Sequence, residues 1–140
     1  MAYWLMKSEP GTWSWDDQVK AGARGTAWDG VRNHQAKLNL MKMKRGDRAF
    51  FYHSGEEKRI VGVVEIAGEH RPDTSDKSGV FVVVDVKAVK PLPKPVTLAQ
   101  CKAEKSLAKM VLLNNSRLSV QPVTDAEWKT VCRMGGLKAG

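Results

Sequence analysis

The sequence predicts a single α+β domain in which short helices pack around a curved sheet or barrel. Its 140 residues provide for one hydrophobic core, so we expect residues 1–140 to form one domain. Three β-rich runs with aliphatic faces lie close together in the chain, at residues 48–54, 60–66 and 80–86. Adjacent antiparallel strands of this kind favour a curved sheet or a barrel.

The chain opens with the aromatic and apolar run at residues 3–6. This run is too short for an independent helix and is typical of a buried strand. Pro10 and Gly11 form a turn signal, so residues 7–9 lie where strand gives way to loop. Functional side chains often occupy such positions.

A short helix is predicted next, because Ser14 is a good N-cap residue and acidic residues follow it in the first turn. We expect Gly22 to end this helix, and we expect Trp13 and Trp15 to be packing residues. A second helix is predicted after residue 30, and Gly46 and Asp47 end it. Its expected apolar face is made by Val31, Gln35, Leu38 and Met41.

Prolines at positions 91, 93 and 95 separate the C-terminal third, since a proline-dense segment fits neither a central strand nor a helix interior. Beyond them we expect short helices at 98–104 and 106–113 and a short strand at 118–120. Thr124 and Glu127 have the spacing of a capping box, which opens a final helix that Gly135 and Gly136 close. The tail from Leu137 is expected to be frayed.

The net charge is +8, and it is concentrated in two blocks. Residues 31–59 and residues 91–140 each carry eight basic and three acidic side chains. If the fold brings the two blocks together, they form one cationic face that attracts phosphate backbones; otherwise they are solvated surface. The basic residues concerned are Arg32, Lys37, Lys42, Lys44, Arg45, Arg48, Lys102, Lys105, Lys109 and Arg117.

The sequence has no apolar run long enough to span a membrane and no N-terminal signal, so a cytoplasmic location is expected, or a nuclear one in a cell with a nucleus. The two cysteines, Cys101 and Cys132, fall inside predicted helices and have neither a metal-ligand nor a disulfide spacing. We expect them to be buried thiols, and we expect no metal and no cofactor.

Residues 28–35 combine an aromatic ring, an acid, a base and amides in one short segment, as a pocket for a planar polar ligand requires. Trp28 offers a stacking surface, Asp29 and Asn33 offer donor and acceptor groups, and Arg32 suits an anionic group. Gly30 allows a close backbone approach. The alternative is that Trp28 plugs the core ahead of an Asp-Gly turn.

Several motifs in one order resemble those of the EVE domain, and the match runs from about residue 2 to residue 134. The motifs lie at residues 3–10, 28–33, 46–54, 61–63 and 117–123. EVE domains have a PUA-like fold, a curved β-barrel with helices around it, and they are related to the YTH readers of methylated adenine. The resemblance therefore implies a module that binds DNA or RNA carrying a modified base, with modified cytosines favoured. Separately, we expect the protein to be a monomer.

A reader of this kind takes the base out of the stack, places it against an aromatic face and pairs its polar edge. Trp28 is the first candidate for the stacking surface and Tyr52 the second, and both are expected to face one cavity. Ser8, Asp29, Asn33 and the backbone around Val31 are candidates for the base edge. His53 and Ser54 are candidates for the pocket wall, with a core histidine as the alternative for His53. The phosphate-binding candidates are Lys7, Arg32, Lys37, Lys109 and Arg117.

We expect no enzymatic activity, because the zinc-deaminase signature and the glycine-rich phosphate loops are absent. One enzymatic alternative is a small amidohydrolase acting on acylated cytidine, since related ASCH proteins use a lysine, a hydroxyl residue and a glutamate. Lys7, Ser8 and Glu9 supply these types, but consecutive residues on an extended segment point to alternating faces. A protein-interaction module is the other alternative.

Overall fold

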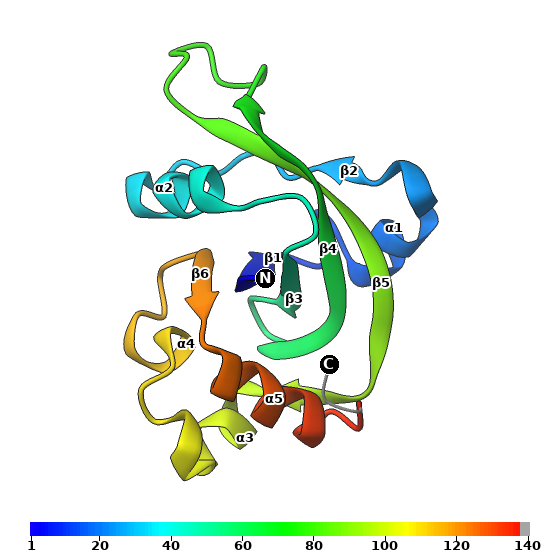
Figure 1. Ribbon diagram of the computed structural model, residues 1–140, viewed down its shortest axis with the longest axis vertical. Helices are drawn as coiled ribbons and strands as arrows, with labels where there is room; N and C mark the ends of the chain where they lie inside the picture. Colours follow the sequence, from blue (N-terminus) through cyan, green and yellow to red (C-terminus); the bar gives the residue numbers. More distant parts are fainter. Residues whose placement is uncertain (138–140) are drawn as a thin grey trace.

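The computed structural model describes residues 1–137, in which six strands form one open, curved sheet with helices against both faces (Figure 1). The spatial order is β2-β5-β4-β3-β1-β6. The strands are β1 (Tyr3–Ser8), β2 (Thr26–Ala27), β3 (Arg48–His53), β4 (Arg59–Pro72), β5 (Val82–Thr97) and β6 (Val120–Val123). The α+β class with a curved sheet is confirmed, although within residues 1–137 the sheet does not close into a barrel.

The first half of the chain supplies α1 (Trp15–Lys20), the 3-10 turn η1 (Gly22–Arg24) and α2 (His34–Lys42). The last third supplies α3 (Leu98–Ala103), η2 (Lys105–Leu107), α4 (Val111–Asn114) and α5 (Asp125–Met134). The N-caps predicted at Ser14 and Thr124 are confirmed, and each forms a full capping box. The tail beyond residue 137 lies outside the described residues. No helix among those described is long and apolar enough to cross a membrane.

Among the described residues, β1 and β3 form a parallel pair, and the other strand pairs are antiparallel. The antiparallel run β3-β4-β5 was predicted from the three β-rich segments and is confirmed. Register shifts interrupt the β4–β5 pairing at several points, and such irregularities increase local twist and bend the strands. The β4–β5 hairpin therefore curves around the core and projects beyond it at the top of Figure 1.

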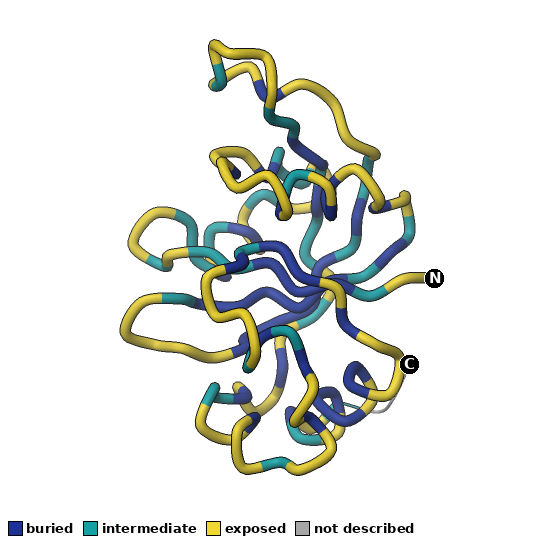
Figure 2. Tube along the Cα trace, turned by 90° about the vertical axis from the view of Figure 1, so that its left-hand side faces the viewer, coloured by how far each residue is buried: buried dark blue, intermediate teal, exposed yellow. Residues whose placement is uncertain are grey.

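Alternation along the strands divides the core into two clusters, one on each face of the sheet. On β3, Ala49 and Phe51 belong to the first cluster, whereas Phe50 and Tyr52 belong to the second. The first cluster packs under α1 and α2, and the second packs under α3, α4 and α5. Figure 2 shows the buried residues concentrated in the strands, with exposed loops around them.

Aromatic stacking attaches α5 to the sheet. The Trp128 ring lies between Tyr3, with 4.3 Å between ring centroids, and Phe50, with 3.9 Å. Both cysteines are buried, as predicted, and desolvation raises the pKa of Cys101 to about 11.

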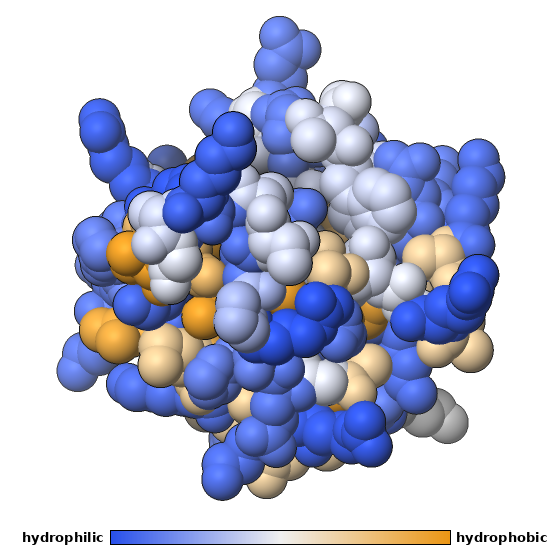
Figure 3. Space-filling model, turned by 90° about the horizontal axis from the view of Figure 1, so that it is seen from above, coloured by the Kyte–Doolittle hydropathy of each residue, from blue (hydrophilic) through white to orange (hydrophobic). Residues whose placement is uncertain are grey.

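The predicted apolar face of α2 was wrong. Leu38 and Met41 are 48% and 40% exposed, and the buried face is formed by Ala36, Asn39 and Leu40. The helix approaches β6 closely because Ala36 is small and because the Asn39 amide donates to the Val120 carbonyl at 2.7 Å. A polar residue that finds a buried backbone partner thus replaced the expected apolar contact. Figure 3, which views the molecule from above, shows apolar surface between hydrophilic side chains.

The proline-dense segment is also not a break, since β5 runs through all three prolines and Pro91 pairs with Gly62 of β4. The other described neighbour of β5 is β2, which pairs with β5 at Asp85 and Val86. Around the prolines β5 is therefore an edge strand, where a missing N–H disturbs no second ladder. In the C-terminal third, the helix expected at 106–113 is divided into η2 and α4, and the last strand begins at Val120 rather than Leu118.

Trp15 of α1 packs directly on Gly62 in the middle of β4. A Cβ added at Gly62 would lie 2.5 Å from the Trp15 ring, which is well inside van der Waals contact. The missing side chain therefore allows α1 to lie close to the sheet.

We predict that Gly62→Ala destabilises the protein by about 1–3 kcal/mol, because the added methyl group must displace Trp15. Urea unfolding monitored by tryptophan fluorescence measures the loss. The control is Gly11→Ala, since a Cβ there meets nothing within 4 Å. Equal stabilities for the two variants would contradict the close packing.

Candidate functional site

A pocket of about 500 Å³ opens where the parallel strand β1 ends. Because β1 and β3 run in the same direction, with Ser8 opposite His53, the loops that follow them leave the sheet at the same edge. The pocket is lined by Lys7, Ser8, Glu9, Thr12, Trp13, Thr26, Ala27, Trp28, Asp29 and Gly30. We call it the tryptophan pocket.

Two tryptophans wall the pocket, and each is held by hydrogen bonds. Trp13 is half-buried; its indole N–H donates to Gln18 Oε1 at 2.9 Å, and its carbonyl accepts from the Ser8 hydroxyl. The backbone N–H of Trp28 donates to the Val84 carbonyl at 2.8 Å. Trp28 is 7% exposed, and its ring meets Phe51 edge-on at 5.4 Å between centroids. Trp28 is therefore both a core residue and a wall of the pocket.

The polar rim carries both signs of charge. Glu9 and Asp29 are exposed carboxylates, and Thr12 adds a hydroxyl. Partial burial lowers the pKa of Lys7, whose ammonium donates to the Ser116 carbonyl and lies 5.6 Å from the centre of the Tyr52 ring. An ionisable group with a shifted pKa beside a pocket is typical of a functional site.

His53 supports the pocket from behind. Its Nε2 accepts the backbone N–H of Trp15 at 3.0 Å, so its ring proton lies on Nδ1 and is donated to Glu57 Oε1 at 2.9 Å. The bond from the Trp15 N–H to His53 connects the first residue of α1 to the end of β3. The histidine thereby fixes the segment that carries Trp13.

The structure brings four of the predicted site residues to the tryptophan pocket: Lys7, Ser8, Trp28 and Asp29. Val31 is buried in the first cluster, and Asn33 caps α2 by accepting from the Ala36 N–H at 2.9 Å. His53 and Ser54 are not among the lining residues, and the Ser54 N–H donates to the Ser8 carbonyl. Arg32 forms an ion pair with Asp73 at 2.9 Å.

Tyr52 does not share the pocket with Trp28, contrary to the prediction. It is 3% exposed and packs in the second cluster, because strand alternation sends Phe51 and Tyr52 to opposite faces. Trp13 packs against the first cluster, as expected, and it also lines the pocket. The turn after Pro10 brings it there, because the N–H groups of Thr12 and Trp13 both donate to the Glu9 carbonyl.

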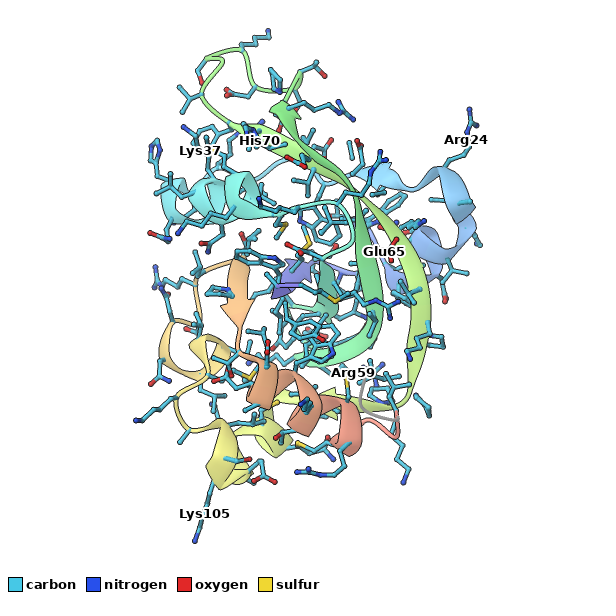
Figure 4. All side chains as sticks on the ribbon, viewed as in Figure 1. Arg24, Lys37, Arg59, Glu65, His70 and Lys105 are labelled. Atoms are coloured by element: carbon cyan, nitrogen blue, oxygen red, sulfur yellow. The ribbon has the colours of Figure 1, made fainter. Side chains whose placement is uncertain are left out.

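The basic candidates are spread over the surface. Arg117 is exposed and follows Ser116, whose carbonyl accepts from the Lys7 ammonium. Lys37 on α2 and Lys105 in η2 lie at opposite ends of the molecule (Figure 4), so the two basic blocks do not merge into one continuous face. Lys109 is exposed between η2 and α4.

The architecture places the chain in the PUA-like class of α+β folds. Its fold is similar to that of a YTH domain from Zygosaccharomyces rouxii, solved with N6-methyladenosine RNA, with a TM-score of 0.57 at 18% identity over 96% of this chain and 86% of the other. The family is more specific: residues 2–134 match the EVE domain, and the chain belongs to that family.

Relatives span nearly the whole chain. Human thymocyte nuclear protein 1 is 35% identical over 93% of this chain and 72% of its own length. A Rhodopseudomonas palustris protein solved by NMR is 65% identical with a TM-score of 0.92, covering 97% of this chain and 94% of the other. The human THYN1 protein, solved in complex with DNA containing 5-methylcytosine, is 35% identical with a TM-score of 0.88, covering 96% and 98%.

We predict that the two tryptophans differ in their contribution to stability. Trp28→Ala should cost about 3–5 kcal/mol, because it leaves a cavity beside Phe51. Trp13→Ala should cost about 1–2 kcal/mol, since only part of its apolar surface is buried. Urea denaturation of both variants provides the comparison, and a Trp28 variant as stable as the parent would contradict its role in the core.

Proposed function

We propose that this protein is a nucleic-acid-binding reader that takes a modified base, with a modified cytosine favoured, into the tryptophan pocket. The observation that carries the proposal is a pocket walled by Trp13 and Trp28 and rimmed by carboxylates. The human THYN1 protein in complex with 5-methylcytosine-containing DNA, from the same family, supports it.

The dimensions and the walls of the pocket suit a single planar ring. Its volume falls within the range of small-ligand sites, about 300–1,000 Å³. Stacking of a base on an aromatic side chain contributes roughly 1–3 kcal/mol whatever the base, so the tryptophans supply affinity more than selectivity. A base paired within a duplex is not accessible to such a pocket, so it must be extruded first.

The rim supports a preference for cytosine. Cytosine presents an exocyclic amino group, a hydrogen-bond donor that carboxylates accept well. Glu9 and Asp29 provide such acceptors, and Ala27 adds an apolar contact of the kind that a substituent at C5 of the ring favours. The amino donor distinguishes cytosine from thymine and uracil, and the C5 contact distinguishes a 5-substituted pyrimidine from adenine and guanine, so only the two features together favour a 5-substituted cytosine.

Phosphate contacts are assigned by position. Lys7 lines the pocket, and its ammonium contacts the Ser116 carbonyl next to Arg117, which supports these two residues as partners for the backbone of an extruded nucleotide. Lys37 on α2 is a more distant candidate. Contacts of this kind position a nucleic acid without specifying its sequence.

An amidohydrolase acting on acylated cytidine is the second candidate, favoured by one observation: Lys7, with its lowered pKa, shares the pocket with Ser8 and Glu9. The Ser8 hydroxyl donates to the Trp13 carbonyl and the Lys7 ammonium to the Ser116 carbonyl, so in this structure the two groups serve different partners. Glu9→Gln would abolish acyl release if this activity existed. Turnover of an acylated cytidine by the parent protein would overturn the reader proposal.

The central prediction concerns Trp13, because its substitution leaves most of the core intact. Trp13→Ala should lose roughly 1–3 kcal/mol of affinity for a short oligonucleotide carrying one 5-methylcytosine. Trp13→Phe should keep most of that affinity, since it retains a stacking face. Calorimetric titration of the parent and both variants measures the difference. Unchanged binding by a folded Trp13→Ala protein would refute stacking on this ring.

The salt dependence of oligonucleotide binding tests the phosphate contacts. Binding should weaken steeply with ionic strength, since each neutralised phosphate of duplex DNA contributes about 0.9 to the log–log slope. Lys37→Glu should reduce affinity for modified and unmodified oligonucleotides alike, whereas Lys105→Glu, at the opposite end of the molecule, should have little effect. Equal losses in both variants would show that only net charge matters.

A further inference from the structure

Asp73 is a buried carboxylate that the proposed function does not yet use. It lies just beyond the end of β4, where the β4–β5 hairpin begins to turn, and only 3% of the residue is exposed. Its own backbone N–H donates to the Phe81 carbonyl at 3.0 Å, which closes the hairpin. A buried charge of this kind persists only where hydrogen bonds compensate for lost hydration.

The compensation comes from two directions. Within the hairpin, Ser75 donates its backbone N–H to Asp73 Oδ1 at 2.8 Å, and its hydroxyl donates to the same oxygen. From the segment between β2 and α2, the Gly30 N–H donates to Oδ2 at 3.1 Å and the Arg32 guanidinium donates to it at 2.9 Å. Burial alone would raise the pKa of Asp73, but bonds from Ser75, Arg32 and Gly30 outweigh it and lower the pKa far below its ordinary value. The carboxylate is therefore ionised throughout the neutral range.

Arg32 is held at several points at once. Besides Asp73, its guanidinium donates to the Val31 carbonyl at 3.0 Å and to the Ser75 hydroxyl at 3.1 Å, and it lies 5.5 Å from the centre of the Phe81 ring. These contacts occupy both terminal nitrogens. A phosphate, the partner that the sequence suggested, would therefore have to compete with Asp73, Val31 and Ser75 for these nitrogens, although the side chain is 42% exposed.

We infer that Asp73 and Arg32 are positioning residues that fix residues 28–32, the pocket loop, against the β4–β5 hairpin, and that Arg32 does not bind phosphate. The loop is then attached at two places, by the Trp28 N–H to Val84 and by Gly30 and Arg32 to Asp73. Asp29 lies between these attachments. Gly30 has a φ of +77°, a conformation that suits glycine and allows its N–H to face the carboxylate.

This inference rests on the proposed function for its effect on binding. With the loop attached, Asp29 and the Trp28 ring keep fixed positions relative to Trp13. If the loop is released, Asp29 and Trp28 no longer keep a fixed position relative to Trp13. The preference for the modified base should then fall, while weak binding to the nucleic-acid backbone remains.

The test compares Asp73→Ala with Asp76→Ala, a matched control in the same hairpin. Asp76 also accepts several hairpin N–H groups, from Ser78, Val80 and Phe81, but its carboxylate makes no hydrogen bond to the pocket loop in the described structure. Amide hydrogen exchange at Gly30 is the first readout, and it needs no nucleic acid. Exchange should accelerate on the order of tenfold or more in Asp73→Ala and in Arg32→Gln, but not in Asp76→Ala.

The second readout is the affinity ratio between oligonucleotides with and without one 5-methylcytosine. Asp73→Ala and Arg32→Gln should each lower this ratio on the order of tenfold, and the double variant should be no worse than either single one. The salt slope should be unchanged in Arg32→Gln. If Arg32 instead binds a phosphate, the slope should fall by about 0.9, affinity should fall equally for both oligonucleotides, and the inference is overturned.

The two proposals fail in different ways. A parent protein that shows no preference for the modified oligonucleotide would refute the reader function, while accelerated exchange at Gly30 would still support the attachment of the loop. Unchanged exchange at Gly30 in Asp73→Ala would refute the attachment whatever the parent binds.

Discussion

The parallel pairing of β1 with β3 is the constraint on which the rest of the structure depends. Parallel neighbours cannot be joined by a tight turn, so the chain needs a long crossover between Ser8 and Arg48. That crossover contains α1, β2 and α2, together with both tryptophans of the pocket. The pocket lies where the crossover leaves the sheet edge, so the connection that the topology requires also supplies most of the residues that line it.

Buried polar groups hold this crossover in place at its two ends and in its middle. Asp47 accepts from the N–H groups of Ala2 and Lys44 and from the Trp4 indole, which joins the end of the crossover to the first strand. His53 fixes the start of α1. Asp73 fixes the segment between β2 and α2. Each group bonds to backbone or side chains far away in sequence, and each would be costly to leave unpaired once buried, so together these bonds favour one arrangement of the crossover.

Signals that depend on neighbouring residues were read correctly from the sequence. The N-cap at Ser14, the capping box at Thr124, the three β-rich runs and the buried cysteines all appear as predicted. Errors arose where a distant partner decided the outcome. Asn39 faces inward, where its amide donates to the Val120 carbonyl, and the buried face of α2 therefore excludes Leu38. The prolines are accommodated in β5 because, within residues 1–137, β4 is the strand that pairs with β5 there and no second strand needs the missing N–H groups.

The sequence by itself determined the family through motifs spread along the chain, and it determined that Trp28 and Asp29 belong together, since neighbours in a loop remain close in any fold. Only the tertiary structure decided which other side chains join them. It brought Trp13 to the pocket through the turn after Pro10, sent Tyr52 to the opposite face of the sheet, and engaged Arg32 with Asp73. The physical reason is that strand alternation and buried hydrogen bonds act between segments far apart in sequence, and composition and spacing do not encode which segments meet.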